Sequence, residues 1–217
     1  MKKWIFCFFM AVHLVAAGQV SKEQQHQKNL RSSVSKIANL GPGCRIELEI
    51  PSDATFRSGY ESNQGPGAAG FSLKMTPDFS SSGDWSFDFN CYKIDEDQVQ
   101  RGWAVRLPAG GWAPNQENGG KELLDNKALR FFPLASKNSN GWAVAVDDTA
   151  GDERYRQRRL IYCLTREMKA VCGESVVGYL DFSKKKGSID LTSRALKILR
   201  GIEFLEDAPP TPESLQR

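Results

Sequence analysis

The chain has 217 residues and a formal net charge of +3, from 29 Lys and Arg against 26 Asp and Glu. That near balance argues against a nucleic-acid-binding protein, whose affinity depends on an excess of Lys and Arg. The length is sufficient for one domain with a hydrophobic core of its own.

Residues 1–18 have the pattern of a secretory signal peptide. Lys2 and Lys3 precede an apolar run over 4–15, and small residues at 16–18 suit cleavage. The apolar run is well short of the roughly 20 residues that span a bilayer, so we expect no stable membrane anchor once the leader is removed. Cleavage also removes both lysines and lowers the net charge to +1. We therefore expect a protein exported to a bacterial periplasm.

Residues 19–40 form a polar segment that we expect to be partly helical. Apolar residues spaced by four, three and three positions are typical of an amphipathic helix, and here they are Leu30, Val34, Ile37 and Leu40. The helix would begin near Asn29 and end at the Gly-Pro-Gly sequence of 41–43. A single domain is expected over 41–206. The tail, 207–217, is rich in proline and polar residues and is expected to be disordered.

Alternation of apolar and polar residues predicts strands at 44–50 and 85–91. The inward positions are Cys44, Ile46, Leu48 and Ile50 in the first strand and Trp85, Phe87, Phe89 and Cys91 in the second. Each strand thus has a cysteine on its core-facing side, and we expect a disulfide between Cys44 and Cys91. Further strands are expected at 71–75, 128–132 and 142–146.

The apolar runs at 160–164 and 170–172 predict a hairpin that turns at Glu167 and Met168. This register places Cys163 opposite Cys172, within the range of a disulfide. A bridge there would close a short loop and contribute about 2–3 kcal/mol to stability. Two buried free thiols are the alternative. An even number of cysteines in an oxidising compartment favours two bridges.

A helix is predicted after Asp190, which can cap its N-terminus. Its buried face would consist of Leu191, Ala195, Leu199 and Ile202, and its solvent face of Arg194, Lys197 and Arg200. Residues 202–205 alternate as a short closing strand. A lone helix of this kind usually covers one face of an antiparallel sheet. The expected fold class is therefore α+β, a single domain of mainly antiparallel sheet covered by a C-terminal helix.

Two regions are candidate partner-binding surfaces. The loop over 108–120 is rich in Gly, Asn and Pro and contains Trp112. Arg154, Arg156 and Arg158 occupy alternate positions, which would place them on one face of a strand, where they either blunt a sheet edge or face a partner. The acidic loop that starts at Asp147 lacks EF-hand spacing, and a solvated turn is favoured there over a calcium site.

The run over 195–205 resembles the closing helix and strand of PsbP-like α/β proteins. Together with the leader and the paired cysteines, this ending is similar to that of small periplasmic immunity proteins encoded beside type VI secretion toxins. The resemblance implies a protein that neutralises a toxin encoded by a neighbouring gene. It includes no diagnostic motif and therefore implies no site residues.

The histidines exclude the commonest catalytic schemes. His13 leaves with the leader and His26 lies in a polar stretch, so the core has no histidine for a catalytic triad, a Cys-His pair or a His-based metal site. We expect a non-enzymatic protein without cofactor or metal, which binds a partner protein through Trp112, Arg154, Arg156 and Arg158. One alternative is an envelope protein that binds a glycan or small ligand on Trp103, Trp112 or Trp142. The other is a hydrolase built on two carboxylates.

Overall fold

The computed structural model describes residues 32–59, 67–75, 84–100, 102–117, 119–180 and 190–207. The predicted signal peptide, the first part of the predicted N-terminal helix and nearly all of the predicted tail lie outside these residues. None of the helices in the described ranges is long and apolar enough to cross a membrane.

The described strands form two main sheets and one hairpin, and all of their pairings are antiparallel. The first sheet has the order β1 (Ser33–Asn39), β2 (Arg45–Pro51) and β12 (Glu203–Leu205). The second has the order β3 (Thr55–Gly59), β4 (Ala68–Lys74), β5 (Asp84–Lys93), β11 (Lys169–Tyr179), β10 (Gln157–Arg166), β9 (Asn140–Asp147) and β8 (Leu129–Ala135). The hairpin consists of β6 (Ala104–Arg106) and β7 (Trp112–Pro114).

The helices within the described ranges are few and short beside these sheets. They are α2 (Asp97–Gln100), α3 (Gly120–Asp125), α4 (Thr192–Gly201) and one 3-10 turn, η1 (Glu153–Tyr155). The fold is therefore mainly antiparallel sheet with a C-terminal helix, which confirms the coarse prediction but lies closer to an all-β class than to the expected α+β class.

The predicted N-terminal helix is wrong where the structure describes it. Residues 33–39 form β1, which pairs along its whole length with β2. Val34 and Ile37 lie on opposite faces of this strand, with 37% and 48% of their surface exposed, and do not share one buried stripe. Gly41 and Gly43 have φ angles of 109° and 74°, and this left-handed backbone makes the tight connection that brings β2 back along β1. Strand pairing thus overrides the helical spacing.

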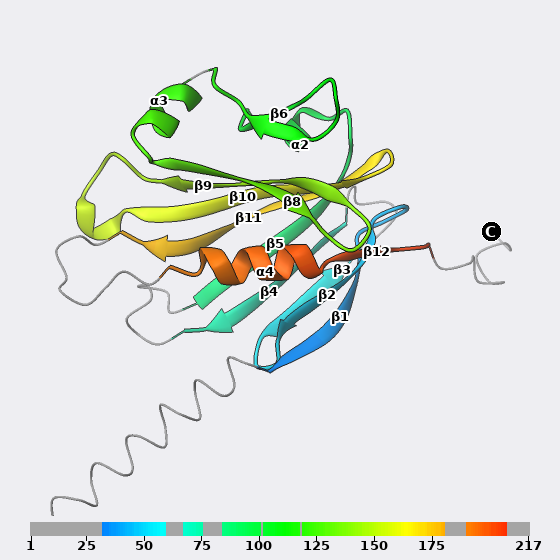
Figure 1. Ribbon diagram of the computed structural model, residues 1–217. Coiled ribbons are helices and arrows are strands. Elements are labelled where there is room, and N and C mark those ends of the chain that lie inside the picture. The colour runs from blue at the N-terminus through cyan, green and yellow to red at the C-terminus, as the bar shows by residue number, and fades with distance from the viewer. Residues whose placement is uncertain are drawn as a thin grey trace, which may run out of the picture.

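The main core lies between the two sheets and includes the buried face of α4 (Figure 1). The inward residues predicted for β2 and β5 are all buried here, as are Ala195, Leu199 and Ile202 from α4 and the residue that follows it. Asp190 Oδ1 accepts a hydrogen bond from the backbone N–H of Thr192 at 2.9 Å. The N-cap of α4 is nevertheless Leu191, one residue after the predicted Asp190, and its side chain makes no capping bond.

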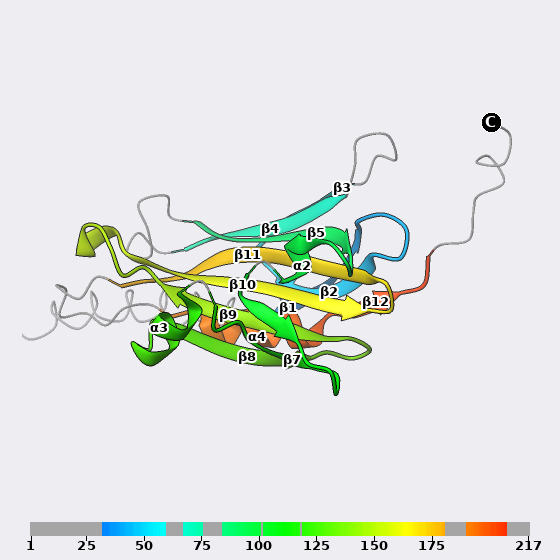
Figure 2. The same ribbon diagram turned by 90° about the horizontal axis from the view of Figure 1, so that it is seen from above.

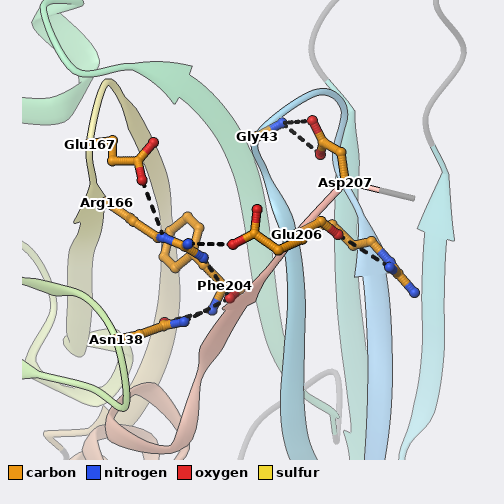
Figure 3. Close-up of polar contacts among 8 residues, drawn as sticks. Gly43, Asn138, Arg166, Glu167, Phe204, Glu206 and Asp207 are labelled. Carbon is orange, nitrogen blue, oxygen red and sulfur yellow. Dashed lines mark hydrogen bonds and ion pairs between the residues drawn. The ribbon is translucent and has the colours of Figure 1, made fainter. Parts of the chain in front are cut away.

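Side-chain hydrogen bonds join the three-stranded sheet to the rest of the protein along both of its edges, which we call the two seams. At one seam β1 and β3 lie side by side, and the backbone N–H of Asn39 donates to Ser58 Oγ at 3.1 Å. At the other, Asn138 pairs with β12 as a strand would, because it donates to the carbonyl of Phe204 at 2.7 Å and accepts from the N–H of Phe204 at 2.9 Å. Arg166 also donates to that carbonyl and pairs with Glu206 at 2.7 Å (Figure 3). The edge of β12 is therefore blocked against further strands.

A second, smaller core lies on the opposite face of the seven-stranded sheet. Here α3 and the β6–β7 hairpin lie over β8 and β9, and α2 lies against β5 and β11 (Figures 1 and 2). Trp142 is fully buried, donates from Nε1 to the carbonyl of Val99 at 3.1 Å, and lies 6.5 Å from the ring of Trp112. The sheet is therefore covered on both faces at this end.

Both predicted disulfides are present. Cys44 is bonded to Cys91, with 5.9 Å between the Cα atoms, and joins the start of β2 to β5 in the other sheet. Cys163 is bonded to Cys172 directly across the β10–β11 hairpin, which turns at Glu167 and Met168 as predicted. Two disulfides fit a secreted protein.

Candidate functional site

The three arginines predicted to form a row do not lie on one strand face. The backbone of Arg154 belongs to η1, and β10 begins only at Gln157. Arg158 binds Asp147 through two bonds of 2.5 and 2.6 Å and binds Asp190 at 2.6 Å. The bond with Asp147 is the main reason why the pKa of Arg158 is raised. This arginine therefore ties β9 and β10 to the start of α4.

The other predicted contact residues are spread over different parts of the molecule. Arg156 donates to the carbonyl of Gly151 at 3.2 Å and lies 3.7 Å from a carboxylate oxygen of Glu153, while the side chain of Arg154 lies outside the described part. Trp112 is only 9% exposed and holds the hairpin on the second core. The structure does not bring these residues together as one surface.

The predicted loop over 108–120 is more regular than expected, since it contains β7 and the start of α3. Its exposed parts are the turn at 108–111, closed by a bond from the N–H of Gly110 to the carbonyl of Leu107, and residues 116, 117 and 119. The three tryptophans named for glycan stacking pack on the second core, with Trp103 half-buried. They therefore offer little exposed ring surface to a sugar.

The acidic loop at Asp147 is engaged by protein groups. Asp147 is bound to Arg158, and Asp148 Oδ2 accepts from the backbone N–H of Gln157 at 3.0 Å. Among the residues that the structure describes, no group of three or more His, Cys, Asp or Glu side chains could hold a metal ion.

A groove of about 620 Å³ runs between α4 and the ends of β1 and β2. Ile50, Pro51 and Ile198 supply apolar lining, and Gly201 adds no side chain of its own. The polar lining residues are Ser32, Ser33, Glu49, Lys137, Ser193, Arg194 and Lys197. A sequence-based search misses this groove, because one wall belongs to β1, which the residue spacing assigns to a helix.

The helix presents a continuous stripe to the groove. Residues 194, 197, 198 and 201 are three or four positions apart and so lie on one side of α4, while Ala195 and Leu199 point into the core. The predicted solvent face of the helix thus contributes two of its three cations, Arg194 and Lys197, to the groove. Arg200, the third, is exposed elsewhere.

The lining of the groove contains more cationic than anionic side chains. Lys197 is exposed and has no ion-pair partner among the described residues. The guanidinium of Arg194 lies 5.5 Å from the ring centre of Trp85. Burial lowers the pKa of Arg194, and the negative charge of Asp53 partly offsets this effect. Lys137 binds Glu203 at 3.0 Å, which raises its pKa. The carboxylate of Glu49 accepts a bond from Ser33 Oγ at 3.1 Å. The lining residues thus include three cations and one carboxylate, and one of the cations, Lys137, is already paired with Glu203.

Comparisons with known proteins add little to this picture. No family model and no curated protein matches the chain. A crystal structure at 1.50 Å resolution of a protein from Bacteroides thetaiotaomicron VPI-5482 aligns with 80% of the chain at 15% identity and a TM-score of 0.37. The chain spans half of that protein's length.

Proposed function

We propose that this chain is an exported, non-enzymatic binding protein of the periplasm that holds a segment of another protein in the α4 groove. The observation that carries the proposal is the groove itself, whose lining combines the cations Lys137, Arg194 and Lys197 with apolar residues. Interfaces gain most of their affinity from a small buried apolar centre, and charges at the rim select the partner.

The lining defines the chemistry of the bound segment. A segment with an Asp or Glu side chain would complement Lys197, and one apolar side chain would lie against Ile198. Because Lys197 has no described ion-pair partner, pairing it with a carboxylate would not break a described salt bridge. The proposed ligand is therefore an acidic protein segment with an apolar anchor.

An antibacterial toxin is the partner class that we propose. An inhibitor that meets a toxin in an oxidising compartment benefits from covalent bonds that resist unfolding, and the two disulfides provide them. A toxin encoded by a neighbouring gene, of the type VI secretion kind, is the first candidate to test. The test is co-purification of the mature protein with that gene product, and rescue of cells that express the toxin.

Filling the groove tests whether it is the contact surface. A Cβ on Gly201 would meet no atom within 4 Å, so the side chain of Gly201→Leu would project into open space. Leucine also suits a helix better than glycine, and the fold should be retained. We expect partner affinity to fall at least about tenfold, as for loss of a central contact. Gly59→Leu is the control, because Gly59 has the same open space and does not line the groove.

Charge reversal tests the acidic character of the segment. Lys197→Glu should weaken binding and reduce its dependence on salt, whereas Arg200→Glu, on the same helix but outside the groove lining, should not. Equal effects of the two reversals, or full rescue by Gly201→Leu, would show that the partner binds elsewhere.

A further inference from the structure

The pairing between β5 and β11 ends part-way along both strands. Residues 90–93 of β5 pair with residues 169–172 of β11, although β5 begins at Asp84 and β11 continues to Tyr179. The pairing of β11 with β10 is also interrupted, by a bulge next to Arg159. Bulges redirect side chains and are frequent beside functional sites. Both irregularities lie at the same end of the sheet.

Side chains bridge the gap where the backbone pairing stops. Trp85 Nε1 donates to Ser175 Oγ at 3.0 Å, and Ser175 Oγ donates to the carbonyl of Ser86 at 2.6 Å. The hydroxyl of Tyr162 donates to the carbonyl of Asp88. These bonds satisfy β5 carbonyls that a continuous ladder would have paired. A pocket of about 260 Å³ opens here, lined by Ser86, Asp88, Gln157, Arg159, Glu174, Ser175 and Val176.

The pocket holds charges of both signs on three strands. Asp88 comes from β5, Glu174 from β11 and Arg159 from β10, and all three side chains are exposed. Although Asp88 is exposed as a residue, partial desolvation of its carboxyl group raises its pKa; the charge of Arg57 opposes this shift, and the charge of Glu174 adds to it. Arg159 forms no ion pair with any residue in the described ranges.

We propose that this pocket binds a small zwitterion of the size of an α-amino acid. Its ammonium group would lie between the carboxylates of Asp88 and Glu174, and its carboxylate would pair with the guanidinium of Arg159. Ser86 and Gln157 offer further hydrogen-bonding groups. The volume is below the roughly 300–1,000 Å³ of pockets for drug-sized ligands, which favours a ligand of few atoms.

This inference does not depend on the proposed function. The lining residues other than Ser175 belong to the outer side of the seven-stranded sheet, whereas α4 packs on its inner side. Loss of toxin binding and loss of zwitterion binding are therefore separate outcomes.

The test is a titration of the mature protein with glycine, alanine and serine, followed by NMR of the indole N–H protons. The Trp85 indole is bonded to the pocket residue Ser175, whereas the Trp142 indole is bonded to Val99 in the second core and serves as an internal control. We expect a saturable shift of the Trp85 signal alone. Ethylamine and propionate each carry one of the two charges and should bind at least about tenfold more weakly than alanine.

Variants then assign the contacts. Arg159→Met and Glu174→Gln should each weaken alanine binding about tenfold or more, while Arg106→Met, an exposed arginine on β6, should leave it unchanged. Should one pocket variant fail to fold, the other decides. The proposal is overturned if none of the three amino acids shifts the Trp85 signal, if ethylamine binds as tightly as alanine, or if the folded pocket variants bind like the wild type.

Discussion

Replacing Cys44 and Cys91 together by alanine removes the bond that joins the two sheets. The bond closes a loop over a sequence separation of 47 residues, against 9 for Cys163–Cys172. Loop-closure entropy then gives a loss of about 4 kcal/mol for the first pair and about 2.6 kcal/mol for the second. All four cysteines are buried, so the packing lost with the sulfur atoms is similar in the two double variants. The difference between them therefore reports loop length.

Urea unfolding of the mature protein, followed by tryptophan fluorescence and far-UV circular dichroism, measures both free energies of unfolding. We expect the Cys44/Cys91 variant to be the less stable by about 1.4 kcal/mol, because its unfolded chain regains more freedom. A Cys163/Cys172 variant that loses as much stability as the other, or more, would refute the entropy argument. It would show instead that the hairpin depends on the Cys163–Cys172 disulfide because Glu167 and Met168 do not favour a tight turn.

Three further predictions concern packing, a strand edge and pH. A side chain at Gly173 would overlap the carbonyl of Asp88 and crowd the Tyr162 hydroxyl, so Gly173→Ala should lower stability by about 1–3 kcal/mol in urea unfolding, while Gly59→Ala, in open space, should not. Asn138→Ala removes the side chain that bonds both the N–H and the carbonyl of Phe204, which should lower stability by about 1–3 kcal/mol. Hydrogen exchange of the Phe204 amide should become faster, and unchanged exchange would show that Asn138 does not protect β12. Burial acts to raise the pKa of Asp190, but the hydrogen bonds from Thr192 and the charges of Arg158 and Arg130 outweigh it and hold this pKa below 3.8. The ionised carboxylate therefore stabilises the fold fully above pH 3.8, and this stabilisation is lost as the pH falls through the lowered pKa. Asp190→Asn should therefore be less stable than the wild type at pH 7, and the difference should shrink on acidification in a series of unfolding curves.

Local sequence patterns predicted most of the sheet. Alternation identified β2 and β5 together with their buried residues, because only one face of each strand reaches the main core. The β10–β11 hairpin and α4 followed from equally regular patterns. The prediction failed at β1, where the spacing of Val34 and Ile37 fits a helix, because pairing with β2 is a long-range interaction that residue spacing does not encode.

Neither candidate site could be predicted in this way. The α4 groove joins residues 32–33, 49–51, 137 and 193–201, and the pocket at Asp88 joins three strands distant in sequence. The arginines that looked available for a partner include Arg158, whose charge is neutralised by Asp147 and Asp190. Whether a charged side chain is available depends on its neighbours in space.

The sequence by itself determined the strand faces and the buried stripe of α4, because each follows from a repeat of two or about 3.6 residues. It left three ways to pair four cysteines, and the structure has the pairing that we expected. Only the tertiary structure decided that β1 is a strand, that Arg158 forms ion pairs within the protein, and that cations lie beside α4. Those outcomes depend on contacts between residues far apart in the chain, and such contacts exist only once the two sheets have packed.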